Sequence, residues 1–314
     1  MPEGQHERAP IDPAKFQDPL VTAKGEIRAT VGLSGLKTLW FNTGSLCNIT
    51  CDNCYMDSSP TNDDLVYLAQ GHVQHYLEEI ATNGWSIDEI GFTGGEPFMN
   101  KDLVAMLHDV LDRGFKALVL TNAMKPLWQK RNDLLAVKSE NLTLRVSVDH
   151  YTQGAHENIR GDGTWPPMVE GIKWLIENGF QIDIAGRTLW DETEEQSRQG
   201  YQQLFDAWGL KLNAADPTHL VLFPEMDAHV DVPEITTQCW GILNVRPDAM
   251  MCATSRMVVH RKGEASPSIA PCTLLPYDTR FDLGKTLVEA HTDVALNHPH
   301  CAKFCVLGGA SCSA

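Results

Sequence analysis

The segment LKTLWFNTGSLCNITCDNCY, residues 36–55, joins an apolar stretch that predicts a strand to three cysteines within eight residues. Cys47, Cys51 and Cys54 follow this strand in a loop. Reactive groups of parallel α/β sheets lie at the carboxyl ends of the strands, so we expect chemistry in this loop. Three thiols are one fewer than the four protein ligands of a structural zinc site or a closed iron–sulfur cluster. The spacing predicts a metal centre with one open position, the alternatives being a zinc knuckle or reduced core thiols.

Strand-like and helix-like stretches alternate on the carboxyl side of this segment. Strands alternating with helices predict a parallel sheet with right-handed crossovers. Six units are too few for the closed eight-stranded barrel, so the predicted fold class is α/β, a partial (β/α)6 barrel. The expected strands are 36–42, 87–95, 116–122, 142–149, 180–188 and 219–224, and the expected helices lie in 64–83, 103–111, 126–139, 169–176 and 192–208.

Composition excludes some classes of function. The 314-residue chain carries a net charge of −16, which repels phosphate backbones and anionic membranes, so we expect no nucleic-acid or membrane partner. The start lacks a signal core and no stretch approaches the roughly 20 apolar residues of a membrane span, so we expect a cytoplasmic protein. Disulfides are rare in that compartment. The nine cysteines instead fall into two groups, the three above and a late group of six, which predicts two metal centres.

A second motif, GFTGGEP at residues 91–97, ends the second expected strand. Gly94 and Gly95 carry no side chain, which lets the backbone approach a ligand closely. Glu96 adds a negative charge that suits an ammonium group. This turn is therefore predicted to face the same ligand as the cysteine loop.

Together, these motifs resemble the CxxxCxxC and GGEP signatures of radical S-adenosylmethionine (SAM) enzymes. The resemblance implies a [4Fe–4S] cluster on the three cysteines, whose free iron chelates SAM. It also implies reductive cleavage of SAM to a 5′-deoxyadenosyl radical that abstracts a substrate hydrogen. The family's aromatic residue precedes the third cysteine, where Asn53 stands here and Tyr55 comes two residues later. The implied SAM-binding residues are Gly94, Gly95, Glu96, Asn122, Ser147, Asp149, Arg187 and Tyr55, although Asp149 and Arg187 could instead form a structural ion pair.

The late cysteines resemble the SPASM or shorter Twitch extension of radical SAM proteins, and HENIRGDGTW (156–165) resembles a segment of members with auxiliary clusters. Cys252 and Cys272 lie on either side of an expected hairpin. The resemblance implies one auxiliary [4Fe–4S] cluster with four ligands from Cys252, Cys272, Cys301, Cys305 and Cys312. Cys239 is either a spare ligand or a thiol that faces substrate. The alternative is a zinc site, to which His298 and His300 could contribute; otherwise these are solvated loop residues.

The resulting expectation is a radical SAM oxidoreductase with an N-terminal arm (1–36), a partial barrel (37–225) and an auxiliary-cluster domain (226–314). A small-molecule substrate is favoured, because a one-cluster auxiliary domain resembles that of dehydrogenases acting on small alcohols. The short arm shows no winged-helix peptide-recognition segment, which weakens the peptide alternative. The resemblance implies a reductase such as flavodoxin or ferredoxin as electron donor. The alternatives are a peptide-modifying maturase and, from another class, a non-catalytic iron–sulfur carrier or sensor. The acidic stretch 223–234 is expected either to face a cationic substrate or to be solvated.

Overall fold

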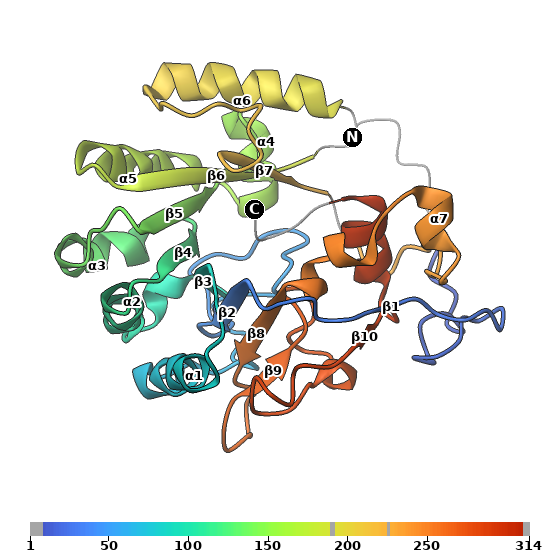
Figure 1. Ribbon diagram of the computed structural model, residues 1–314. Helices are drawn as coiled ribbons and strands as arrows, with labels where there is room; N and C mark the ends of the chain where they lie inside the picture. Colours follow the sequence, from blue (N-terminus) through green and yellow to red (C-terminus); the bar gives the residue numbers. More distant parts are fainter. Residues whose placement is uncertain (1–8, 189–191, 225–226, 310–314) are drawn as a thin grey trace.

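One eight-stranded sheet organises the chain in the computed structural model, which describes residues 9–188, 192–224 and 227–309 (Figure 1). Six strands follow one another in sequence and in space, and each pairs in parallel with the next. The strand order is linear, β7-β6-β5-β4-β3-β2-β8-β9, which confirms the open, partial barrel. The six strands are β2 (Thr38–Asn42), β3 (Glu89–Thr93), β4 (Lys116–Thr121), β5 (Leu142–Ser147), β6 (Gln181–Arg187) and β7 (Leu220–Phe223).

The sheet is wider than the sequence predicts. Strand β8 (Ser255–Val259) adds to the free side of β2 in parallel, and β9 (Ser268–Ala270) pairs with β8 in antiparallel orientation. The β8–β9 hairpin confirms the expected hairpin between Cys252 and Cys272. Its pairing with β2 was not predicted, because the β/α rhythm ends before residue 225 and a strand carries no local signal for a distant partner.

Helices cover one face of this sheet (Figure 1). Their ends follow local chemistry. Thr193 and Gln196 form a capping box at the start of α6, and Gly84 and Gly209 end α1 and α6 in the left-handed conformation that glycine tolerates. The helices are α1 (Gln70–Asn83), α2 (Leu103–Asp112), α3 (Lys125–Ala136), α4 (Gln153–Arg160), α5 (Trp165–Glu177) and α6 (Glu194–Trp208).

Alternation along the strands separates two apolar cores. In β2, Leu39 and Phe41 belong to the core under the helices, whereas Trp40 belongs to the core on the opposite face. That second core also holds Cys252, Cys272, Cys301 and Cys305. The C-terminal cysteines thus pack against the face of the sheet that the helices leave uncovered.

Short elements build this second layer. Strand β1 (Thr30–Val31) of the N-terminal arm pairs antiparallel with β10 (Val294–Ala295), so the arm and the C-terminal segment hold each other. The other elements of this layer are α7 (Cys239–Leu243), the 3-10 helices η2 (Pro247–Ala249), η3 (Met251–Ala253) and η4 (Thr279–Phe281), and the π-helix η5 (Cys301–Leu307). The 3-10 helix η1 (Pro97–Met99) instead follows β3, and its Phe98 belongs to the core under the helices. No helix in the described ranges is long and apolar enough to cross a bilayer.

Two carboxylates of the acidic stretch 223–234 have partners within the chain. Asp231 forms an ion pair with Lys15, and Glu234 with the buried Arg28. The Glu234 carboxylate also accepts the backbone N–H groups of Phe16 and Ala23. These two carboxylates therefore hold the N-terminal arm, while the Asp231 side chain remains partly exposed to solvent. Residues 225–226 lie outside the described ranges.

Candidate functional site

The loop with Cys47, Cys51 and Cys54 leaves the carboxyl end of β2 and is held by the turn after β3. The backbone N–H of Gly95 donates to the Gly44 carbonyl at 2.8 Å, and that of Glu96 donates to the Leu46 carbonyl at 3.1 Å. A Cβ on Gly95 would lie 2.1 Å from the Leu46 carbonyl oxygen. A Cβ on Gly94, whose φ is +134°, would lie 2.5 Å from the Gly44 carbonyl oxygen. The glycines are therefore required for packing against the cysteine loop, a reason that sequence reasoning missed.

The Glu96 side chain points into the protein, where it is only 2% exposed. It accepts hydrogen bonds from the Thr121 hydroxyl at 2.8 Å and from the backbone N–H groups of Asn122 at 2.8 Å and Phe98 at 3.1 Å. Burial raises the pKa of Glu96 to about 7, although these donors oppose the shift. A carboxylate has about four acceptor positions, so three are filled by the protein and about one remains for a ligand.

Asn122, at the end of β4, connects this carboxylate to the cysteine loop. Its backbone N–H binds Glu96, and its side-chain amide donates to Asn48 Oδ1 at 2.9 Å. The same Nδ2 lies 4.0 Å from the Cys47 sulfur. Asn122 therefore orients the first cysteine as well as facing the cavity described next.

A cavity of about 130 Å³ lies at the carboxyl ends of the parallel strands and gathers most of the predicted site. Glu96 is the one predicted SAM-binding residue that stands behind its wall. The predicted residues that line it are Cys47, Cys51, Cys54, Tyr55, Gly94, Gly95, Asn122, Ser147, Asp149 and Arg187, with Arg160 as an addition that the site prediction lacked.

Charged side chains meet at one side of this cavity. Arg160 makes a two-pronged pair with Asp149, at 2.7 Å from Nε and 3.1 Å from Nη2. Arg187 Nε lies 3.7 Å from the same carboxylate, so the ion pair considered from the sequence is present. Burial opposes ionisation of Asp149, but the charges of Arg160 and Arg187 outweigh it and lower the pKa. Two guanidinium groups on one carboxylate leave a net positive charge beside the thiols, which suits an anionic ligand.

Arg160 was missed because it ends helix α4 rather than a strand. The only signal for Arg160 in the sequence was its place in the segment 156–165, which resembles a segment of radical SAM proteins with auxiliary clusters. His156 of the same helix is fully buried and accepts the Asp149 backbone N–H at 3.2 Å through Nδ1. Helix α4 therefore fixes both the backbone and the side chain of Asp149.

Tyr55 belongs to an aromatic wall of the cavity. The Arg187 guanidinium lies 4.8 Å from the centre of its ring, and its hydroxyl donates to the Pro224 carbonyl at 2.7 Å. The ring is nearly perpendicular to those of Phe223 and Phe304, with ring centres 5.7 Å and 6.3 Å away. Phe304 lies in η5 between Cys301 and Cys305, so Tyr55 connects the two groups of cysteines.

The three thiols suit a metal cluster more than reactive side chains. Burial raises the pKa of Cys47 to about 12, and burial also raises the pKa of Cys51 against the charge of Arg160. Such thiols stay protonated until a metal displaces the proton. Together with Cys54 they line one cavity wall beside excess positive charge, which fits three-point ligation of a [4Fe–4S] cluster.

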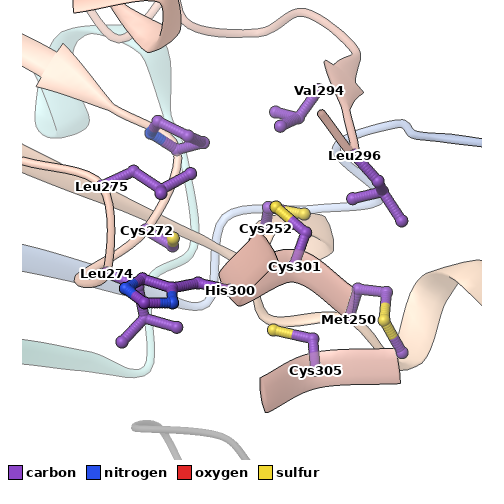
Figure 2. A pocket seen from close by; sticks show the side chains of 11 residues that line it. Met250, Cys252, Cys272, Leu274, Leu275, Val294, Leu296, His300, Cys301 and Cys305 are labelled. Carbon is purple, nitrogen blue, oxygen red and sulfur yellow. The ribbon is translucent and has the colours of Figure 1, made fainter. Parts of the chain in front are cut away.

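Four of the late cysteines line a second cavity (Figure 2). Cys252 comes from η3, Cys272 follows β9, and Cys301 and Cys305 come from η5. Burial raises the pKa of Cys252 to about 11 and holds that of Cys301 well above its usual value of 9.0. Four thiols around an otherwise apolar space fit a closed [4Fe–4S] cluster.

The two other late cysteines are placed differently. Cys239 begins α7, where its sulfur lies 3.4 Å from both the backbone nitrogen and the hydroxyl of Thr236, and it does not line the second cavity. The spare-ligand role suggested for Cys239 finds no support in this placement. Cys312 lies outside the described residues.

His298 and His300 are largely buried, which corrects the expectation of solvated loop residues. Burial lowers the pKa of His298 to about 3 and that of His300 to about 4. The two rings contact each other, with centres 4.6 Å apart, and His300 lines the four-cysteine cavity. Within the described ranges, no three His, Cys, Asp or Glu side chains are arranged to hold a single metal ion.

Comparison with known proteins agrees with this geometry. Residues 41–195 match the family model of the radical SAM superfamily. The antilisterial bacteriocin subtilosin biosynthesis protein AlbA of Bacillus subtilis (strain 168) is 29% identical over 267 residues, which cover 79% of this chain and 57% of AlbA. An S-adenosylmethionine-dependent nucleotide dehydratase of Selenomonas ruminantium is 34% identical over 76 residues, covering 24% of this chain and 26% of that protein. The chain thus spans about half, or less, of the length of these curated relatives.

A solved structure shares the fold. SuiB of Streptococcus suis aligns with a TM-score of 0.60 at 12% identity, covering 84% of this chain and 67% of SuiB. Other SuiB structures contain S-adenosylmethionine or the precursor peptide SuiA. The family match, this fold and the three-cysteine cavity agree, and residues 41–195 of the chain are a radical SAM domain.

Proposed function

We propose that this chain is a radical SAM enzyme that cleaves S-adenosylmethionine and abstracts a hydrogen atom from a peptide substrate. One observation carries the proposal: three thiols, a glycine turn and the Asp149–Arg160–Arg187 cluster line the same cavity. A non-catalytic iron–sulfur carrier needs the thiols but has no use for the charged cluster at the cavity wall. That feature favours an enzyme over a carrier or sensor.

In this proposal, Cys47, Cys51 and Cys54 hold the SAM-binding cluster. When bound, a [4Fe–4S] cluster with one open iron supplies the electron that cleaves SAM into methionine and a 5′-deoxyadenosyl radical. Arg160 and Arg187 together carry one more charge than Asp149 neutralises, and this excess positive charge suits the carboxylate of SAM. The two arginines are therefore the proposed partners of that carboxylate.

The remaining proposed contacts line or support the same cavity. Glu96, with its remaining acceptor position, is the proposed partner of the SAM ammonium group. Gly94 and Gly95 present the turn that holds the cysteine loop. Asn122, Ser147, Asp149 and Tyr55 complete the proposed SAM contacts.

We also propose an auxiliary [4Fe–4S] cluster on Cys252, Cys272, Cys301 and Cys305. Their common cavity supports this choice among the late cysteines. The proposed division into an arm (1–36), a barrel (37–225) and an auxiliary-cluster region (226–314) keeps each cysteine set in one part. A flavodoxin or ferredoxin is the proposed electron donor.

The peptide substrate replaces the small molecule favoured by the sequence. AlbA is named for bacteriocin biosynthesis, and its match extends over 79% of this chain, well beyond the radical SAM domain. The nucleotide dehydratase is named for a small-molecule substrate, but its match covers only 24% of this chain. Oxidation of a small molecule is therefore the second candidate function.

Deuterium transfer tests the reaction and the substrate class together. A bacterial extract grown in heavy water is separated by size into peptide and metabolite fractions, and each is incubated anaerobically with reconstituted protein, SAM and dithionite. The proposal predicts deuterium in 5′-deoxyadenosine with the peptide fraction. Transfer from the metabolite fraction alone would replace the peptide with a small molecule, and no SAM cleavage by iron-loaded protein would refute the enzyme.

A further inference from the structure

His300 lines a cavity whose other lining residues carry thiols and apolar groups. The cavity wall consists of Cys252, Cys272, Cys301 and Cys305 together with His300 and six apolar residues, which Figure 2 shows as sticks. Its surface is almost entirely apolar apart from the sulfurs. The imidazole is therefore the one side chain on this wall with a nitrogen-bound donor.

The Nδ1 atom of His300 is buried and has no hydrogen-bond partner among the described residues. Buried polar atoms are nearly always paired, and an orphan in a native structure calls for an explanation such as a bound ion or a redox role. Leaving such an atom unpaired costs roughly 1–3 kcal/mol. A partner inside the cavity would remove that cost.

The neighbouring His298 does not share this property. Its Nδ1 accepts the backbone N–H of His300 at 3.1 Å, and it does not line the cavity. His298 thus stabilises the start of η5, whereas His300 lines the four-cysteine cavity.

We infer that His300 donates an Nδ1–H hydrogen bond to a sulfur of the auxiliary cluster and so raises its reduction potential. This inference rests on the proposed auxiliary cluster. One-electron reduction adds negative charge that is shared by the sulfurs, and a donor aimed at a sulfur stabilises the reduced state more than the oxidised state. His300 is in this account a positioning and tuning residue, while the four cysteines remain the ligands.

The test uses the full chain with Cys47, Cys51 and Cys54 replaced by alanine, so that only the auxiliary cluster contributes. The reduction potential is measured by following the paramagnetic signal of the reduced cluster at set potentials. His300→Phe keeps a ring of similar volume but removes the donor. We expect the equilibrium constant for reduction to fall about tenfold, which is 59 mV for a one-electron couple.

Two further variants separate hydrogen bonding from packing. Met250→Leu changes another residue of the same wall that has no N–H donor, and it should leave the potential unchanged. His300→Gln restores an N–H donor and should recover part of the lost potential. If His300→Phe fails to retain iron, His300→Leu serves as the donor-free protein. The inference then predicts a potential for His300→Leu below that of the His300 protein, with His300→Gln between them, and equal potentials in all three proteins would overturn it.

The possible outcomes distinguish failure of the His300 hydrogen bond from failure of the proposed auxiliary cluster. A His300→Phe protein with about four irons per chain and an unchanged potential would overturn the hydrogen bond while leaving the cluster in place. Zinc without iron in the cysteine-to-alanine background would overturn the auxiliary cluster and the hydrogen bond together. A lowered potential in His300→Phe, with a partial recovery in His300→Gln, supports both.

Discussion

Gly95→Ala isolates the packing between the glycine turn and the cysteine loop. The added Cβ would lie 2.1 Å from the Leu46 carbonyl oxygen, whereas real Cβ contacts essentially never fall below 3.0 Å. The backbone of Leu46 must therefore move by about 1 Å, and Cys47 follows it directly in the chain. Overpacking of this kind costs about 1–3 kcal/mol, and the contact with rigid backbone places Gly95→Ala at the upper end. For a chain of this length, about 3 kcal/mol lowers Tm by about 5 °C.

The assay is thermal unfolding of the protein, together with iron content after anaerobic reconstitution. We expect a lower Tm and preferential loss of the iron that belongs to Cys47, Cys51 and Cys54. Gly71→Ala is the matched control, because no atom lies within 4 Å of its added Cβ and the residue is in helix α1, where alanine is favoured. A Gly95→Ala protein with the Tm and iron content of the wild type would refute the steric argument.

Three further changes test other parts of the structure. Asp149→Asn leaves Arg160 and Arg187 buried without their carboxylate and should cost about 3–5 kcal/mol at neutral pH. Burial opposes ionisation, yet the two arginines lower the pKa of Asp149 below its usual 3.8, so its stabilising effect is complete above pH 3.8 and is lost as the pH falls further. Chemical unfolding from pH 3 to 6 should therefore show a steeper acid loss in the wild type than in Asp149→Asn, and equal slopes would contradict the pairing. Phe304→Ala removes the ring between Tyr55 and the C-terminal cysteines and should cost about 3–5 kcal/mol in the same assay. Tyr55→Phe keeps the aromatic ring but loses the hydrogen bond to the Pro224 carbonyl, and it should cost about 1 kcal/mol. Arg28→Met leaves Glu234 buried without its ion pair and should expose the N-terminal arm to limited proteolysis, whereas Lys15→Met, at a more exposed pair, should not; equal cleavage of both would argue against the buried pair as the anchor.

The sequence predicted the part of the site that strand ends determine. Asn122, Ser147 and Arg187 each end a strand or follow it directly, and parallel strands bring their carboxyl ends to one edge. The cysteine loop and the glycine turn follow the same rule. A regular β/α rhythm is therefore enough to predict that these residues share a cavity.

Contacts between distant segments could not be predicted in this way. Strand β8 pairs with β2 although more than 200 residues separate them, and nothing local to either strand specifies the pairing. The contact of Tyr55 with Phe304 and the burial of His300 depend on how the C-terminal segment packs on the sheet. Arg160 was not predicted, because it reaches Asp149 from the end of a helix. The packing role of Gly95 was not predicted either, because it depends on the Leu46 backbone in another loop.

Cleavage of SAM is the most direct measurement of the central claim. The wild-type protein, reconstituted anaerobically and reduced with dithionite, should convert SAM to 5′-deoxyadenosine. Replacement of Cys47, Cys51 and Cys54 by alanine should abolish the product, and Cys239→Ala, whose thiol lines neither cysteine cavity, should retain it. Formation of 5′-deoxyadenosine at the wild-type rate by the triple variant would contradict the assignment of these three thiols.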